Sequence, residues 1–374
     1  MTEPVVENKK HRRKLIFLLL SGAAGIILLV IGGYQLMEFT DSTDFCGRLC
    51  HQVMYPEYTV YQESPHSRVN CVECHVGYGG GYFVRSKISG IPQVWAVLTN
   101  SYERPITTPV KNLRPARETC EQCHRPERFA GDLVISHTTY APDNANTERV
   151  DTRIMRVGGG EAEAARDIHW HIAASVWYLP LDAARQDIGW VGVEDSSGGL
   201  AEYFSPDKSS EITPERIEKE RRLMDCVDCH NRATHVYRSP EELVDTALAQ
   251  GKIDKTLPYI KWQGVTALDP VNPSLELAIS KIEAIREFYR NNYPDVLAAQ
   301  GASIDRAIEE LKNIARLTTF PEMKVTWETY IDNIGHQKGP GCFRCHGKLE
   351  ARQAGAEKEA IDADCSLCHY LALQ

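Results

Sequence analysis

The chain lacks the surplus of positive charge that nucleic-acid-binding proteins carry. Among its 374 residues, 42 lysines and arginines face 51 aspartates and glutamates, so the formal net charge is −9. Several of the basic residues are concentrated in one short run, Lys9–Lys14, and the remainder of the chain is therefore more acidic still. This balance argues against a nucleic-acid partner and favours a basic protein partner, because opposite charges steer association.

The second absence is that of charge between residues 15 and 37, "LIFLLLSGAAGIILLVIGGYQLM". At roughly 1.5 Å per residue, a helix of this length crosses a bilayer. The positive-inside rule predicts that the basic tail, residues 1–14, stays in the cytoplasm and that everything after the helix lies on the outer, periplasmic face of the inner membrane. A cleaved signal peptide is the alternative, but its apolar region is shorter, about 7–15 residues.

No cysteine is left unpaired in the sequence. The twelve cysteines fall into six close pairs: Cys46 and Cys50, Cys71 and Cys74, Cys120 and Cys123, Cys226 and Cys229, Cys342 and Cys345, Cys365 and Cys368. In five pairs the spacing is Cys-x-x-Cys and a histidine follows at once: His75, His124, His230, His346 and His369. This is the attachment signature of c-type haem, in which two thiols hold the porphyrin and the histidine binds the iron.

Zinc sites and disulfides also use paired cysteines. Zinc, however, does not require a histidine directly after the second cysteine, and only 13 of the 374 residues are histidines. The recurrence of histidine at that position therefore favours haem over both alternatives. The first pair has one extra residue, Cys46-x-x-x-Cys50-His51, and is predicted to attach a sixth haem; a disulfide beside an unrelated histidine is the alternative.

A low-spin haem iron needs a sixth ligand, usually a second histidine or a methionine. Apart from the proximal histidines and His11 of the tail, six histidines remain: His66, His137, His169, His171, His235 and His336. All are candidate distal ligands, although His169 and His171 are so close that both need not serve. Met54, three residues after His51, is a candidate for the first haem, with a packed methionine as the alternative.

The predicted fold is mainly α, with haems forming the core, one N-terminal transmembrane helix and a partly β insertion. The apolar runs "SVWYL" and "GWVGV" predict strands, whereas Ser239-Pro-Glu-Glu242 predicts a helix start that Gly251 closes. Two helical patterns, Leu275 to Tyr289 and Ile304 to Ile314, predict a hairpin. The expected segments after the helix are 38–128 with three haems, 129–212 partly β, 213–236 with the fourth haem, 237–320 helical, and 321–374 with the last two haems.

The anchor, the membrane-proximal motif with Met54, "SPHSRVNCVECHVG" and "CVDCHNRATH" together resemble the NapC/NirT family of membrane-anchored quinol dehydrogenases. The resemblance covers about residues 10–125 and 222–236. It implies that His235 caps the second haem and that His66 caps the fourth. It also implies that Lys87 lies near a quinol site, although the acidic residue that accompanies this lysine in the family is missing after Ser89; a solvated or headgroup-facing Lys87 is the alternative.

The expected function is electron transfer from menaquinol, taken directly or through a quinol-oxidising membrane subunit, along six c-type haems to a periplasmic acceptor. The acceptor would be a cytochrome or a reductase with a basic surface. A haem subunit of a larger respiratory complex with no quinol site of its own is a second hypothesis. A terminal reductase is a third, disfavoured because enough histidines exist to close every iron, whereas substrate reduction needs an open position.

Overall fold

In a computed structural model, the chain is described over residues 9–49, 51–77, 79–110, 114–161, 164–194, 199–268, 272–351 and 359–370. Cys50 lies outside the described residues, and so does the side chain of His51.

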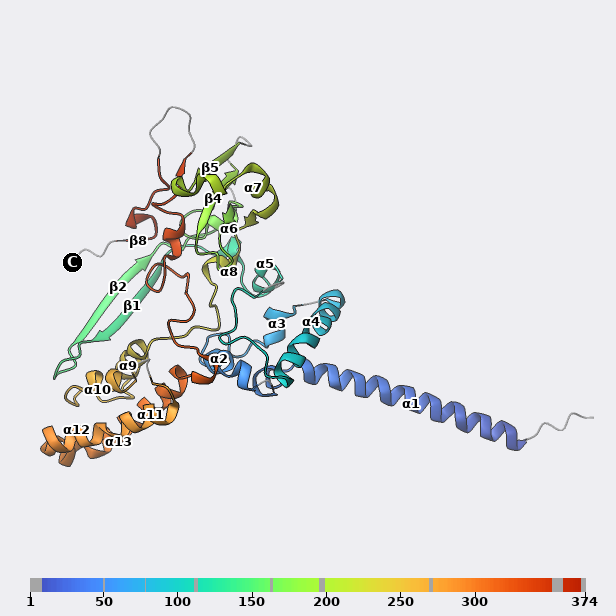
Figure 1. The fold of residues 1–374 in the computed structure, drawn as a ribbon, viewed down its shortest axis with the longest axis horizontal. Coiled ribbons are helices and arrows are strands. Elements are labelled where there is room, and N and C mark those ends of the chain that lie inside the picture. The colour runs from blue at the N-terminus through green and yellow to red at the C-terminus, as the bar shows by residue number, and fades with distance from the viewer. Residues whose placement is uncertain are drawn as a thin grey trace, which may run out of the picture.

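One long helix, α1 (Lys9–Asp41), projects from the rest of the molecule (Figure 1). It contains the predicted run 15–37, and its large apolar side chains are exposed, from Leu15 at 59% to Phe39 at 51%. The stretch His11–Asp41 is long and apolar enough to cross a membrane. Exposed leucines and isoleucines all around a helix are stable in lipid and costly in water, so α1 fits a single membrane anchor.

Short helices that bear the first three motifs follow α1. They are the π-helix η1 (Phe45–Leu49), α2 (His51–Gln62), α3 (Cys71–His75), α4 (Gly80–Leu98), α5 (Ala116–Cys120) and the 3₁₀ turn η2 (Pro126–Arg128). Few side chains are buried here; Val53 and Val60 of α2 pack against Tyr237 and Phe320.

The insertion forms two antiparallel sheets that later parts of the chain complete. The first sheet has the order β1 (Leu133–Tyr140), β2 (Glu148–Met155) and β8 (His369–Tyr370). The second has the order β6 (Arg222–Leu223), β3 (Trp177–Pro180), β4 (Ile188–Glu194), β5 (Leu200–Phe204) and β7 (Glu350–Ala351). The predicted strands in "SVWYL" and "GWVGV" correspond to β3 and β4, and Leu179 and Trp190 are fully buried.

Five helices form a compact unit with an apolar core of its own, built around residues such as Leu257, Ile282, Ile304 and Leu311. They are α9 (Pro240–Ala249), α10 (Ile260–Ala267), α11 (Leu275–Glu283), α12 (Ile285–Asn292) and α13 (Pro294–Thr318). Ser239 caps α9 as predicted: its side chain accepts the backbone N–H of Glu242 at 3.1 Å. The first arm of the predicted hairpin is divided at Ala284 into α11 and α12.

The remaining elements are short and connect these parts. They are α6 (Trp170–Ala173), η3 (Pro206–Glu211), α7 (Pro214–Glu220), α8 (Cys226–Cys229), η4 (Pro321–Met323), η5 (Gly341–Arg344) and η6 (Cys365–Leu367). Helices thus dominate the described residues and are accompanied by two small sheets, in line with the predicted mainly α fold with a partly β insertion.

Candidate haem-binding sites

The Cys-x-x-Cys-His motifs fold as single helical turns. The backbone N–H of the histidine donates to the carbonyl of the first cysteine in three of them: His124 to Cys120 at 2.8 Å, His230 to Cys226 at 2.8 Å and His346 to Cys342 at 3.1 Å. A turn closed in this way brings the two cysteines and the histidine to one end of the loop, as attachment to one porphyrin requires.

The first motif begins in a π-helix rather than an α-helix. η1 covers Phe45–Leu49 and therefore contains Cys46 and the residues that separate it from Cys50. A π-turn closes one residue later than an α-turn, i to i+5 instead of i to i+4. The wider π-turn at Cys46 is therefore suited to the extra residue in Cys-x-x-x-Cys.

Four histidine rings from distant segments face a proximal histidine. The ring centroids are 6.2 Å apart for His75 and His235, 6.0 Å for His124 and His66, 6.4 Å for His230 and His169, and 5.8 Å for His346 and His171. Imidazole nitrogens bind first-row metals at roughly 2 Å, so two rings on opposite sides of one metal have centroids about 6 Å apart. The four pairs therefore fit bis-histidine ligation of iron.

The orientation of the four distal candidates points to the same chemistry. In each, Nδ1 lies within hydrogen-bonding distance of a backbone carbonyl: Ala233 for His66 at 3.3 Å, Val157 for His169 at 3.1 Å, Ile168 for His171 at 2.8 Å, and Glu57 for His235 at 3.1 Å. A carbonyl partner fixes the proton on Nδ1 and leaves the lone pair of Nε2 for a metal. Among the residues that the structure describes, no three His, Cys, Asp or Glu side chains gather as a metal site; the histidines meet in pairs instead.

Burial keeps several of these rings neutral. It lowers the pKa of His75, His171 and His230, and it lowers that of His235 to about 4. His235 lowers the pKa of His75 further, and His169 lowers that of His230, because two nearby imidazoles do not both take up a proton. Neutral imidazole is the form that binds metals.

The family resemblance implied positions for His235 and His66; the observed pairing agrees with the first position and differs from the second. His235 lies beside His75 of the second motif, as the family resemblance implied. His66, implied as the cap of the fourth haem, lies beside His124 of the third motif, while His169 occupies the place opposite His230. The inserted segment supplies this histidine. Both histidines of "HWH" face a motif, because the turn at α6 directs His169 and His171 to different partners.

The other predicted ligands have no histidine partner within the described ranges. His137 on β1 and His369 on β8 lie on opposite sides of β2: His137 pairs with Asp151, and His369 pairs with Met155. At about 3.3 Å per residue and about 4.8 Å between strands, the sheet separates them by about 16 Å. The ring of His336 packs against that of Phe343, a residue of the fifth motif, with 5.1 Å between the ring centroids. The side chain of Met54 is half-buried and packs against the Val53 and Phe320 cluster.

Cysteines of successive motifs are close to one another. A hydrogen bond from Cys46 lowers the pKa of Cys71 to about 6, and one between Cys120 and Cys226 lowers that of Cys120 to about 7. Burial raises the pKa of Cys74 and Cys368, and the nearby thiols of Cys120 and Cys342, respectively, raise it further. Burial also raises the pKa of Cys229; Arg344 opposes this rise and Cys342 adds to it. Successive motifs thus lie next to one another in chain order. In Figure 1, α3, α5 and β8 lie progressively farther from the end of α1.

Two charged residues inside motifs join the fourth and fifth sites, and the sequence analysis missed them. Asp228 accepts the Tyr178 hydroxyl at 2.6 Å and the Arg185 guanidinium at 3.1 Å. Arg344, also buried, donates to the backbone carbonyl of Asp228 at 2.6 Å and to that of Arg185 at 2.9 Å. The signal was present in "CVDCH" and "CFRCH": a charged residue inside a buried turn requires a partner.

Lys87 lies where α4 meets the C-terminal end of α1. Its ammonium group pairs with the carboxylate of Asp41, contacts the hydroxyl of Thr40 at 2.9 Å and lies 4.9 Å from the ring centre of Phe83. An acidic partner, absent after Ser89 in the sequence, is therefore supplied by Asp41 of α1. Sequence spacing does not reveal this pair because the two residues belong to different helices.

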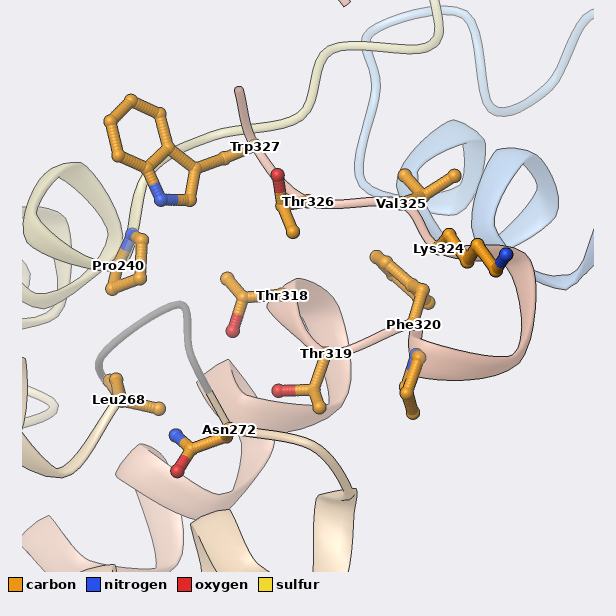
Figure 2. Close-up of a pocket in the computed structure, with 11 residues that line it drawn as sticks. Pro240, Leu268, Asn272, Thr318, Thr319, Phe320, Lys324, Val325, Thr326 and Trp327 are labelled. Atoms are coloured by element: carbon orange, nitrogen blue, oxygen red, sulfur yellow. The ribbon is translucent and has the colours of Figure 1, made fainter. Parts of the chain in front are cut away.

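A cavity of about 240 Å³ lies between the helical unit and the segment that follows α13, lined by Asn272, Thr319, Phe320 and Trp327 among others (Figure 2). The amide oxygen of Asn272 and the indole nitrogen of Trp327 are buried there without hydrogen-bond partners. Such groups in a space of this size suit ordered water. None of the lining residues is a predicted haem ligand.

The motif turns and the histidine pairs define a c-type cytochrome with an apolar helix that fits a single membrane anchor. Comparison with known proteins agrees with this class. Residues 8–108 match the N-terminal region of the NapC/NirT cytochrome c family. The chain is 45% identical over 368 residues to the cytochrome c-type protein ImcH of Geobacter sulfurreducens, which covers 97% of this chain and 72% of that protein.

A second relative is the cytochrome c-type protein NrfH of Wolinella succinogenes, 28% identical over 107 residues, or 27% of this chain and 59% of that protein. No solved structure matches the chain significantly. The chain belongs to the NapC/NirT family of c-type cytochromes. Membership implies covalently bound haem and a role in electron transfer.

Proposed function

We propose that this protein is a hexahaem electron conduit, anchored in the inner membrane by α1, which carries electrons from menaquinol to a periplasmic acceptor. The observation that supports the proposal is that successive motifs lie beside one another in chain order, from Cys46 near the end of α1 to Cys368. Haem supplies the one-electron redox chemistry. The chain supplies cysteines for attachment, and histidine pairs in which the distal ring holds its Nδ1 atom against a backbone carbonyl and leaves Nε2 for iron.

Paired ligands favour a conduit over a reductase. Four motifs have a second histidine at a separation that suits a closed, six-coordinate iron. A closed iron exchanges electrons without binding substrate, whereas reduction of a small molecule needs an open coordination position.

Direct oxidation of menaquinol would take place at the pair formed by Lys87 and Asp41. Oxidation of a quinol to a quinone releases two electrons, which the attached haems would take up one at a time, and two hydroxyl protons, one of which would pass to Asp41 and the other to water at the membrane surface. The carboxylate of Asp41 is able to accept a proton from a quinol hydroxyl, and the ammonium of Lys87 holds that carboxylate in place and donates to the quinol oxygen. The pair lies at the end of the membrane helix, where a lipid-soluble quinol arrives.

The test is reduction of the isolated protein in detergent by a menaquinol analogue, followed by absorbance. We expect rapid reduction of the haems, slowed by Lys87→Ala and by Asp41→Asn, with haem content unchanged. Arg85→Ala removes an exposed cation two residues from Lys87 and is the matched control, expected to keep the normal rate. If the isolated protein stays oxidised while a larger native complex is reduced by the same quinol, the protein is a haem subunit without a quinol site.

A further inference from the structure

We propose that α4 is a second membrane contact, lying in the outer surface of the bilayer with one apolar side chain row immersed among the lipids. The row, called the α4 stripe, consists of Val84, Ile88, Ile91, Trp95 and Leu98. This inference does not depend on quinol oxidation: it concerns how the cytochrome is held, and it stands if electrons enter by another route.

The α4 stripe follows helical periodicity. Its members are separated by four, three, four and three residues, a spacing that places them on one face of a helix. Their exposed fractions are 56% for Val84, 63% for Ile88, 67% for Ile91, 67% for Trp95 and 76% for Leu98. A helix on a soluble surface turns its apolar face inward; α4 turns an apolar face outward.

The rest of the molecule contacts α4 on a different face. Phe83, Ser86 and Val97 are half-buried, and Val97 packs against the cluster that contains Val53 and Phe320. The protein body therefore lies on that side of the helix. The α4 stripe is directed away from them.

The position of α4 identifies lipid as the occupant. Lys87 joins α4 to Asp41 and Thr40, the last residues of the membrane helix. Figure 1 shows α4 beside this end of α1. Since α1 leaves the bilayer at that point, α4 is held at the level of the lipid headgroups, and the α4 stripe continues the exposed apolar surface of α1.

The composition of α4 suits an interfacial helix. Its only charged residues are Arg85 and Lys87, both basic. Basic side chains beside an apolar face are typical of helices that lie in the plane of the membrane, because they reach phosphate groups while the apolar face is immersed. Trp95 lies within the stripe, and tryptophan is enriched at the boundary between water and hydrocarbon.

Photo-crosslinking in the full-length holoprotein tests this contact. p-Benzoylphenylalanine is placed at Ile91 or at Trp95, and the protein is reconstituted into vesicles of phosphatidylethanolamine and phosphatidylglycerol. Leu28 of α1, 68% exposed, is the positive control, and Val150 of β2, 60% exposed and distant from α1, is the negative control. Intact absorbance spectra confirm that each variant carries its haems.

Peptide mass spectrometry identifies what each side chain captures. We expect lipid adducts from Ile91 and Trp95 at a yield close to that of Leu28 and several times that of Val150. Yields at the Val150 level from both positions would overturn the inference. So would adducts with porphyrin or with a second copy of the chain, which would show that haem or protein covers the stripe. Since two positions are tested, a failure of one variant to assemble leaves the other to decide.

Discussion

At the residue scale, the histidines of "HWH" show how one short segment serves two sites. His169 lies 6.4 Å from His230 and His171 lies 5.8 Å from His346, between ring centroids. The Nδ1 atoms bond to different carbonyls, those of Val157 and Ile168, so each ring is fixed separately. Trp170 between them packs against His171 at 5.5 Å.

Replacing either histidine should open one iron. We expect His169→Ala and His171→Ala each to convert one haem from low to high spin, because the paired ring would no longer supply the sixth ligand. Electron paramagnetic resonance detects the change, and added imidazole should reverse it. His11→Ala, in the N-terminal part of α1, removes a histidine far from any motif and should leave the spectrum unchanged. Unaltered spectra for both variants would show that these histidines are structural.

At the element scale, the π-helix η1 is the feature that distinguishes the first motif. Gly47 is buried there against Tyr58 of α2, and a Cβ on Gly47 would lie 2.1 Å from the tyrosine ring. The turn therefore tolerates no side chain at this position without displacement of α2, whose first residue is His51.

Gly47→Ala should accordingly impair the first site. We expect a larger fraction of molecules with five haems instead of six, because the displaced turn no longer presents both cysteines together. Intact mass spectrometry counts the haems. Gly90→Ala in α4, where a Cβ meets nothing within 4 Å, is the matched control and should keep the full number. Equal haem counts in the two variants would contradict a role for the π-turn in attachment.

Also at the element scale, we expect the stability of the helical unit α9–α13 not to depend on haem attachment. Leu311 is fully buried and contacts Gly264, in a core without motif residues. Leu311→Ala should destabilise the unit by about 2–5 kcal/mol through lost burial and a cavity. Faster hydrogen exchange in α11 and α13, with an unchanged haem count, is the expected result; Leu277→Ala, 41% exposed, should have little effect. Loss of haem from Leu311→Ala would show that the unit supports the sites.

Local patterns predicted much of these elements, but not their partners. The Ser239 cap, β3 and β4 follow from neighbouring residues, and the structure contains them. The two-residue strands β6, β7 and β8 have no local signal, because each forms only where a distant strand offers hydrogen bonds. Histidine pairing is likewise a long-range contact: the residues of a pair come from separate segments, so local sequence does not indicate that His66 lies beside His124.

At the scale of the whole molecule, the cysteine motifs extend from the end of α1 to the last strand. The first motif follows α1 directly, and Cys46 contacts Cys71 of the second. The sixth motif lies beside the fifth, through Cys368 and Cys342. Electrons that enter at the membrane would therefore meet the first site before any other, and those that leave would do so at the far end.

This order predicts the behaviour of a protein without its first haem. Cys46→Ala combined with Cys50→Ala should yield a mass with five haems, compared with six in the unaltered chain. Dithionite, a small soluble reductant, should still reduce all five, because it reaches each site from water. A menaquinol analogue should reduce them far more slowly than in the parent, since the site nearest the quinol is missing.

Cys365→Ala combined with Cys368→Ala is the matched control. It also leaves five haems, but it removes the last site in chain order, so reduction by menaquinol should proceed at the parent rate. Two equally fast variants would mean that electrons enter away from α1, and a parent mass with five haems would remove Cys46 and Cys50 from the attachment sites. Only entry at the membrane end makes the two five-haem proteins differ toward quinol while they respond alike to dithionite.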